Sequence, residues 1–215
     1  MIAPGPRAAP AWLAAVRALL FDLDGTLVDS DAAVERAWQR WVEEYGCGDR
    51  LAEVGMHGRP AEETVRLLDP GLDERTLRER AQRQLALQYD DREPLERCPG
   101  ATELLAAVER RGLPWAVVTS GDRRLARLRL GAVGIEPPRL VTAEDVAVGK
   151  PDPECFLRGA ELLGVGIEHC LVVEDSEPGL VAGRRAGART AALRGLEGDL
   201  PIADLGELAR LLPSS

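Results

Sequence analysis

The segment Ala18 to Asp31, ALLFDLDGTLVDSD, places acidic residues directly after a short apolar run. Asp22 and Asp24 stand two positions apart and are followed at once by Gly25. Two carboxylates at the end of a buried segment repel each other and lose hydration, which is costly unless a cation or a solvated loop receives them. An Asp-Gly pair alone is also common in solvated turns, so the pattern has both a chemical and a structural interpretation.

Three later segments carry groups that could act together with this pair. They are VVTSG, which contains Thr119, Ser120 and Gly121; GKPDP, which contains Lys150; and VVEDS, which contains Glu174 and Asp175. If the apolar runs before them are parallel strands, their carboxyl ends meet at one edge of the sheet, where open sheets bind ligands. We therefore expect four carboxylates, a hydroxyl and a lysine to converge there.

Groups of these types suit phosphoryl transfer. Carboxylate oxygens are hard ligands of the kind that Mg²⁺ prefers. The metal and Lys150 would cancel the repulsion between a phosphate and an anionic nucleophile, so that one aspartate attacks phosphorus and a second protonates the leaving oxygen. Thr119 and the backbone N–H groups of Ser120 and Gly121 would hold the phosphoryl oxygens.

In this order, DLDGTLVDS, VVTS, GKPDP and VVEDS resemble the four motifs of the haloacid dehalogenase superfamily of phosphohydrolases. The resemblance implies that Asp22 is the nucleophile and that Asp24 is the general acid and base. It also implies a Mg²⁺ site made by Asp22, the backbone carbonyl of Asp24, Glu174 and Asp175, and a phosphate-binding set made by Leu23, Thr119, Ser120, Gly121 and Lys150. Because Asp24 is a carboxylic acid, the resemblance disfavours the dehalogenase chemistry.

The elements that must position these groups alternate along the chain. Apolar runs predict buried strands at 16–21, 113–121, 139–145, 169–176 and 189–195, and amphipathic patterns predict helices at 100–112, 122–134, 153–164, 177–188 and 203–212. This alternation predicts an α/β fold with a doubly wound parallel sheet.

A helical block interrupts that alternation after the first strand. The 97 residues between Asp22 and Thr119 exceed the roughly 30 of a βαβ unit, and helical patterns fill the surplus at 31–46, 59–71 and 72–90. We expect an α/β core at 17–30 and 98–215, an inserted helical cap at 31–97 with hinges near 29–31 and 97–100, and an extension at 1–16 that lies outside the fold. Trp38 and Trp41 are predicted to pack in the core of the cap or at its contact with the sheet domain. Asp29, Ser30 and Asp31 are predicted to solvate the first hinge and to cap the helix that follows.

The expected substrate is a small phosphomonoester. GMHGRPAEETV, residues 55–65, is similar to the cap loop of sugar-phosphate and polyol-phosphate phosphatases of the family, including those acting on 2-deoxyglucose 6-phosphate and glycerol phosphate. His57 and Arg59 would contact substrate hydroxyls or a second anion, although a lone histidine is as often structural. Phosphoglycolate phosphatases, β-phosphoglucomutases and a catalytically silent binding protein on the same fold remain as alternatives.

Composition restricts the partners and the location. The net charge of -9 disfavours general affinity for nucleic acid or an anionic membrane. The four cysteines form no CxxC pair, so we expect free thiols in the cytoplasm rather than a zinc site. We expect a monomer.

Overall fold

A six-stranded parallel sheet forms the centre of the protein in the computed structural model, which describes residues 8–47, 54 and 61–212. The strand order is β5-β4-β1-β6-β7-β8, and every neighbouring pair is parallel. The predicted doubly wound α/β fold is confirmed. The strands are β1 (Ala18–Phe21), β4 (Trp115–Val118), β5 (Leu140–Val141), β6 (Cys170–Glu174), β7 (Arg189–Ala192) and β8 (Leu200–Pro201).

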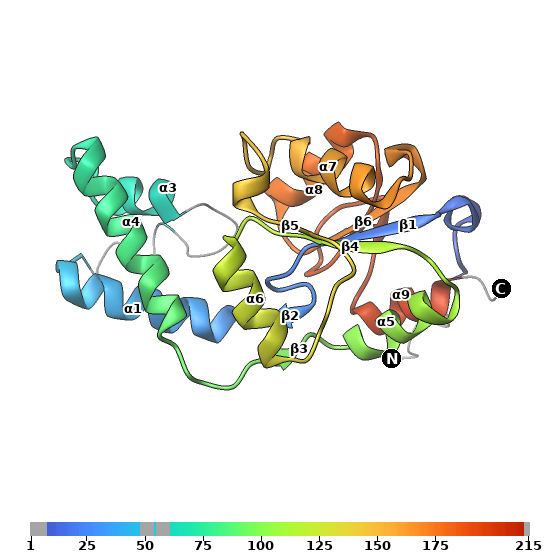
Figure 1. Cartoon of the computed structure of the whole chain (residues 1–215), viewed down its shortest axis with the longest axis horizontal. Coiled ribbons are helices and arrows are strands. Elements are labelled where there is room, and N and C mark those ends of the chain that lie inside the picture. Colours follow the sequence, from blue (N-terminus) through green and yellow to red (C-terminus); the bar gives the residue numbers. More distant parts are fainter. Residues whose placement is uncertain (1–7, 48–53, 55–60, 213–215) are drawn as a thin grey trace, which may run out of the picture.

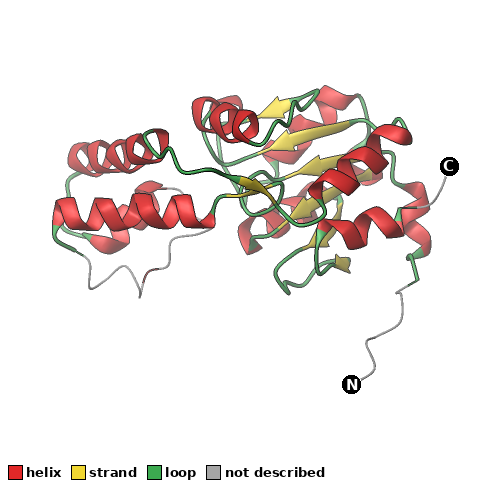
Figure 2. Ribbon diagram, turned by 90° about the horizontal axis from the view of Figure 1, so that it is seen from below, coloured by secondary structure: helices red, strands yellow, loops and turns green. Residues whose placement is uncertain are grey.

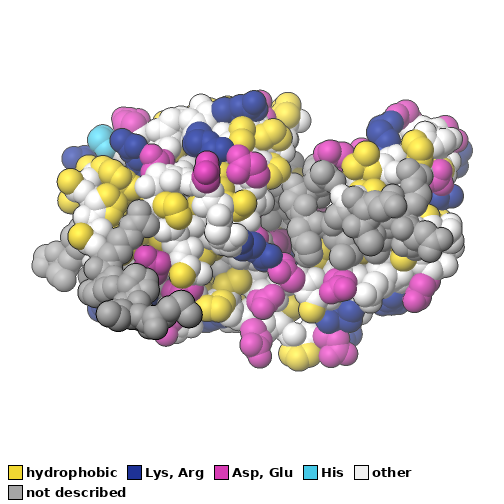
Figure 3. All heavy atoms as spheres, turned by 180° about the vertical axis from the view of Figure 1, so that it is seen from behind, with side chains coloured by type: hydrophobic (Ala, Val, Ile, Leu, Met, Phe, Trp, Pro, Cys, Tyr) yellow, Lys and Arg dark blue, Asp and Glu magenta, His cyan; other side chains and the backbone are white. Residues whose placement is uncertain are grey.

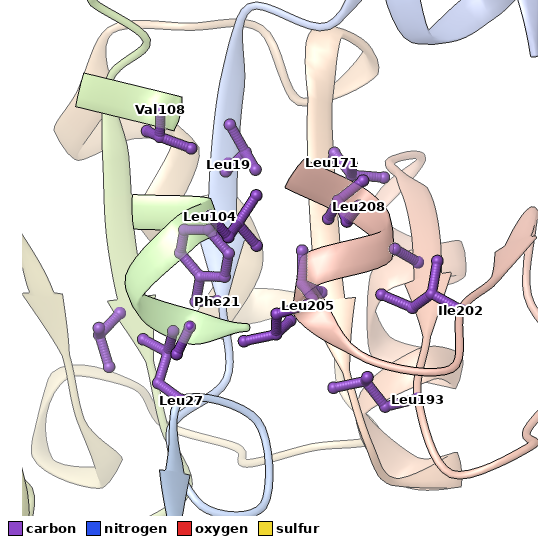
Figure 4. Close-up of a cluster of buried hydrophobic side chains, with 14 of the residues drawn as sticks. Leu19, Phe21, Leu27, Leu104, Val108, Leu171, Leu193, Ile202, Leu205 and Leu208 are labelled. Atoms are coloured by element: carbon purple, nitrogen blue, oxygen red, sulfur yellow. The ribbon is translucent and has the colours of Figure 1, made fainter. Parts of the chain in front are cut away.

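Helices cover both faces of this sheet (Figure 2). In β1, Leu19 and Phe21 point into one hydrophobic cluster, while Ala18 and Leu20 point into the other. Both sides of the strand are therefore dry, which explains its unbroken apolar sequence. Figure 4 shows the first cluster beneath α5 and α9. The core helices are α5 (Ala101–Arg110), α6 (Arg123–Ala132), α7 (Glu154–Leu163), α8 (Glu177–Ala186) and α9 (Leu205–Leu211).

Two short strands of the sheet differ from what the sequence predicts. The run at 139–145 forms only the two-residue strand β5, since Ala143–Asp145 turn into a short 3-10 helix. Strand β8 was not predicted, because two residues ending in a proline are too short to show a periodic pattern.

The prediction that residues 1–16 lie outside the fold is wrong for residues 11–16. Ala11–Ala15 form a 3-10 helix, and Leu13, which is 2% exposed, belongs to the first hydrophobic cluster. Trp12 and Val16 also pack against that cluster. A single apolar turn after Pro10 has no periodicity that would distinguish it from a loose tail, although burial of its leucine stabilises it.

The helices α1 (Asp31–Tyr45), α3 (Ala61–Leu68) and α4 (Glu74–Tyr89) stand apart from the sheet (Figure 1). They share a separate hydrophobic cluster that includes Trp38 and Trp41, so of the two predicted locations for these tryptophans the structure shows the core of the cap. The indole Nε1 of Trp41 donates to the carbonyl of Arg80 at 2.9 Å. We keep the name cap for residues 31–97. None of the helices in the described ranges is long and apolar enough to cross a membrane.

A small antiparallel pair joins the cap to the core. Strand β2 (Val28–Asp29) leads into α1, and β3 (Glu96–Arg97) leads back from the cap (Figure 1). The pair occupies both positions where hinges are expected, so the two connections lie side by side. Movement at these positions stays a prediction.

Candidate active site

The first loop of the site begins where β1 ends. The carbonyl of Leu23 accepts hydrogen bonds from the N–H groups of Thr26, Leu27 and Val28, which closes the turn after Asp22. Gly25 has a φ of +79°, and a Cβ on it would lie 2.1 Å from Asp175 Oδ2. Glycine is therefore required both by its backbone conformation and by the carboxylate packed against it.

Lys150 joins two carboxylates at the centre of this edge. Its Nζ donates to Asp22 Oδ1 at 2.6 Å, to Glu174 Oε1 at 2.7 Å and to the carbonyl of Val118 at 2.9 Å. Burial raises the pKa of Asp22 well above its ordinary value, and Lys150 opposes that rise. Burial alone would lower the pKa of Lys150. The negative charges of Asp22 and Glu174 have the larger effect and raise the pKa of this lysine, so it stays protonated.

Glu174 is held rigidly by the chain that follows β6. Its Oε2 accepts from the N–H groups of Asp175 and Ser176 at 3.0 and 2.9 Å, and from Ser176 Oγ at 2.9 Å. A Cβ on Gly179 would lie 1.7 Å from Glu174 Oε1, so the first turn of α8 makes room for this carboxylate. Ser176 precedes the first turn of α8, and its hydroxyl accepts a hydrogen bond from the N–H of Gly179.

Three acidic side chains, of which Asp22 and Glu174 are buried and Asp175 is half-buried, form a suitable set of ligands for a divalent cation. Asp22, Glu174 and Asp175 each offer a carboxylate oxygen, and these atoms all lie within 4.8 Å of one another. Hard oxygen ligands fit Mg²⁺. Burial, followed by the charge of Glu174, raises the pKa of Asp175 to about 7, although Arg194 and Lys150 oppose this rise.

Asp24 lies beside this set but has different partners. Its Oδ1 accepts a hydrogen bond from Ser30 Oγ at 2.7 Å and makes an ion pair with Nη1 of Arg129. The predicted helix-capping role of Ser30 is therefore wrong for its side chain, which bonds Asp24 and not the first turn of α1.

The predicted phosphate-binding segment follows β4. Thr119 is buried, and its Oγ1 accepts from the N–H of Gly121 at 3.0 Å, while the side chain of Ser120 is exposed. Leu23 has its side chain in the hydrophobic core, so only its backbone is available for binding phosphate. The roles of these groups stay predictions.

Sequence reasoning missed two arginines at the site. Arg129 lies on the buried face of α6 beside Leu125 and Leu130. A charged residue on the apolar face of a helix was the signal in the sequence that could have identified it. Arg194 has a φ of +56°, and its Nε lies 2.8 Å from Asp175 Oδ2. Its Nη1 and Nη2 donate to the two carboxylate oxygens of Asp31 at 2.8 and 2.9 Å, so it connects the predicted metal site to the start of the cap. Asp31 is thus in contact with the site and does not merely solvate the hinge.

The two candidate substrate residues in the cap, His57 and Arg59, lie outside the described residues. On the face seen in Figure 3, acidic and basic side chains are interspersed over both the core and the cap. No large region of one charge stands out among the described residues of that face.

Comparison with known proteins adds independent information about this arrangement. A family model described as haloacid dehalogenase-like hydrolase matches residues 16–187. Hexitol phosphatase A of Escherichia coli (strain K12) is 39% identical over 178 residues, which are 82% of each chain. The 2-deoxyglucose-6-phosphate phosphatase 1 of Saccharomyces cerevisiae is 34% identical over 195 residues, covering 81% of this chain and 78% of the relative. The crystal structure of a hydrolase from Pseudomonas syringae has a TM-score of 0.73 at 28% identity, covering 91% of this chain and 90% of that one.

Proposed function

The chain belongs to the haloacid dehalogenase-like hydrolases, and on this premise we propose that it is a Mg²⁺-dependent phosphatase of a sugar or polyol phosphate that acts through an aspartyl-phosphate. The enzyme class, a phosphoric monoester hydrolase, follows from the family and from relatives that are named phosphatases. The substrate class is taken from the names of the hexitol and deoxyglucose phosphate relatives.

The observation that supports this proposal most is the contact between Lys150 and Asp22. A lysine that stays protonated lies 2.6 Å from a carboxylate at the end of β1, with Glu174 on its other side. The lysine can stabilise negative charge on a phosphoryl group that arrives at Asp22. Asp22 is therefore the carboxylate best placed to act as the nucleophile.

The first chemical step would transfer the phosphoryl group to Asp22. A bond forms between a carboxylate oxygen of Asp22 and phosphorus while the bond from phosphorus to the substrate oxygen breaks. Asp24 gives its proton to that departing oxygen, so the product leaves as a neutral alcohol. Thr119 and the backbone near it would bind the oxygens of the phosphoryl group during the transfer.

The second step would restore the enzyme. Asp24, now ionised, takes a proton from a water molecule whose oxygen attacks phosphorus. The bond between phosphorus and Asp22 breaks, and inorganic phosphate is released. Mg²⁺ held by Asp22, Glu174, Asp175 and the carbonyl of Asp24 would neutralise the charge of the phosphate in both steps.

The proposal is tested by measuring inorganic phosphate released from a panel of phosphorylated hexitols, 2-deoxyglucose 6-phosphate, glycerol phosphate and phosphoglycolate, with Mg²⁺ and with a chelator. We expect release from the hexitol, sugar or glycerol phosphates that depends on Mg²⁺. Preference for phosphoglycolate would contradict the substrate class. β-Glucose 1-phosphate is assayed alongside for isomerisation as well as for phosphate release. Its conversion into an isomer without phosphate release would indicate a mutase, and no turnover of any compound would indicate a binding protein.

A further inference from the structure

Arg129 connects the candidate acid and base of the core to the cap. It lies on α6, and its side chain is 6% exposed. One nitrogen, Nη1, forms the ion pair with Asp24 Oδ1, and the other, Nη2, donates to Gln88 Oε1 at 2.6 Å. Gln88 belongs to α4, the last helix of the cap. A single guanidinium therefore touches both a site carboxylate and the cap.

The cap end of this connection continues from the half-buried Gln88 to the buried Gln84. Gln88 Nε2 donates to Gln84 Oε1 at 2.8 Å, and Gln84 is 1% exposed. Its own Nε2 has no hydrogen-bond partner among the described residues. Burying an amide side chain such as that of Gln84 is costly unless it is hydrogen-bonded. Its presence here favours a specific role for the series of contacts that runs from Asp24 through Arg129 to Gln88.

A neighbouring contact places the end of α4 firmly on α6. The hydroxyl of Tyr89 donates to Asp122 Oδ2, and the guanidinium carbon of Arg124 lies 4.0 Å from the centre of the tyrosine ring. Because this contact does not involve Arg129, the two helices would stay together if the arginine were replaced. A variant at Arg129 can therefore report on Asp24 separately from cap attachment.

The donors around Asp24 determine which of its oxygens faces the chemistry. Ser30 and Arg129 both contact Oδ1. With Oδ1 engaged by two donors, the plane of the carboxyl group is restricted and Oδ2 is the oxygen left to exchange a proton. Arginine suits this position because its planar group can serve two acceptors in fixed directions, whereas the lysine ammonium is a point charge on a flexible stem.

We propose that Arg129 is a positioning residue that orients Asp24 for proton transfer and makes that orientation depend on the position of α4 through Gln88. The inference rests on the proposed function, since it assigns Arg129 a part in the proton transfer by Asp24. A purely structural ion pair between α6 and the first loop is the alternative that the experiment must separate.

The experiment compares two substrates that differ in their need for a proton. The sorbitol released from sorbitol 6-phosphate departs as a strongly basic alkoxide unless its oxygen is protonated, whereas 4-nitrophenyl phosphate releases the stable 4-nitrophenolate. The ratio kcat/KM includes steps only up to departure of the leaving group, so it isolates the protonation by Asp24. It is measured with saturating Mg²⁺ for the wild type and for Arg129→Met, Arg129→Lys and Gln88→Leu.

We expect Arg129→Met to lose about 10-fold to 100-fold in kcat/KM on sorbitol 6-phosphate, part of the gain that a positioned general acid supplies, and about 3-fold or less on 4-nitrophenyl phosphate. Arg129→Lys should recover part of the loss on the alkyl substrate. Gln88→Leu should show a smaller loss of the same selectivity, and Arg129→Met combined with Gln88→Leu should be no worse than Arg129→Met alone. Arg127→Met, an exposed arginine on the same helix, is the matched control and should behave as the wild type.

Equal losses on the two substrates, or a multiplied loss in the double variant, would overturn the inference while leaving the phosphatase proposal intact. Absence of phosphate release by the wild type from both substrates would overturn the proposed function instead. Circular dichroism checks that each variant is folded. If Arg129→Met is not folded, Arg129→Lys and Gln88→Leu decide by the same comparison of substrates.

Discussion

Replacing Lys150 with methionine removes the cation that two buried carboxylates share. Methionine has a similar length but no charge, so the substitution tests electrostatics with little change in volume. Asp22 and Glu174 would lose hydrogen bonds of 2.6 and 2.7 Å and would face each other without the ammonium group between them.

The magnitude follows from the burial of these groups. The side chain of Glu174 is fully buried, and that of Asp22 is 11% exposed. Breaking a buried ion pair by removing one partner costs about 3 to 5 kcal/mol, because a charge is left uncompensated. For a domain of this size each kcal/mol corresponds to about 2 to 4 °C, so we expect Tm to fall by about 6 to 20 °C.

The assay is thermal unfolding in the presence of a chelator, followed by circular dichroism. A second variant makes the test sharper, since Asp22→Asn combined with Lys150→Met removes one of the two charges that repel each other. We expect this double variant to be more stable than Lys150→Met alone. A fall in Tm of less than about 2 °C, or a double variant that is less stable than Lys150→Met, would refute the electrostatic account of the site.

Three further predictions concern the metal site and its surroundings. Burial and Glu174 raise the pKa of Asp175 from its ordinary 3.8 to about 7, so the stability of the metal-free protein should fall as pH rises between these values. Calorimetry should accordingly find tighter Mg²⁺ binding at about pH 8 than at about pH 6, and equal affinities would contradict this. Gly179→Ala puts a Cβ 1.7 Å from a Glu174 oxygen and should cost about 1 to 3 kcal/mol by chemical denaturation, whereas Gly131→Ala, whose Cβ would meet no atom of the described residues within 4 Å, should not destabilise. Because Arg194 has a φ of +56°, its replacement by glycine should be more stable than its replacement by alanine by about 1 kcal/mol, and the reverse order of denaturation midpoints would exclude backbone strain there.

The arrangement of the core could be predicted because its signals are local and repeated. Uniformly apolar runs such as that before Asp22 identify strands covered on both faces, and each motif follows such a run or lies in a loop at the same edge. The resemblance to the family, which rests on the order of four motifs, is confirmed by the family model. The convergence of Asp22, Lys150, Glu174 and Asp175 then follows from parallel topology alone.

The contacts between core and cap could not be predicted in this way. Arg129 meets Asp24 and Gln88 through three separate segments, and the sequence carries no signal for which helix faces pair. Arg194 follows β7 in a left-handed conformation that is rare for a residue with a side chain, so its contact with Asp31 depends on tertiary structure. The roles of His57 and Arg59, a cytoplasmic location and a monomeric state stay predictions.

The central claim is that Asp22 carries the phosphoryl group during turnover. The most direct measurement is mass spectrometry of the peptide that contains Asp22, after the wild-type enzyme is mixed with substrate and Mg²⁺ and quenched rapidly in acid. We predict the added mass of one phosphoryl group on Asp22, which borohydride removes by reducing the acyl phosphate, and neither this adduct nor turnover in a folded Asp22→Asn variant. Phosphate release by the wild type with no such adduct at any quench time, together with near wild-type activity of Asp22→Asn, would contradict the covalent mechanism.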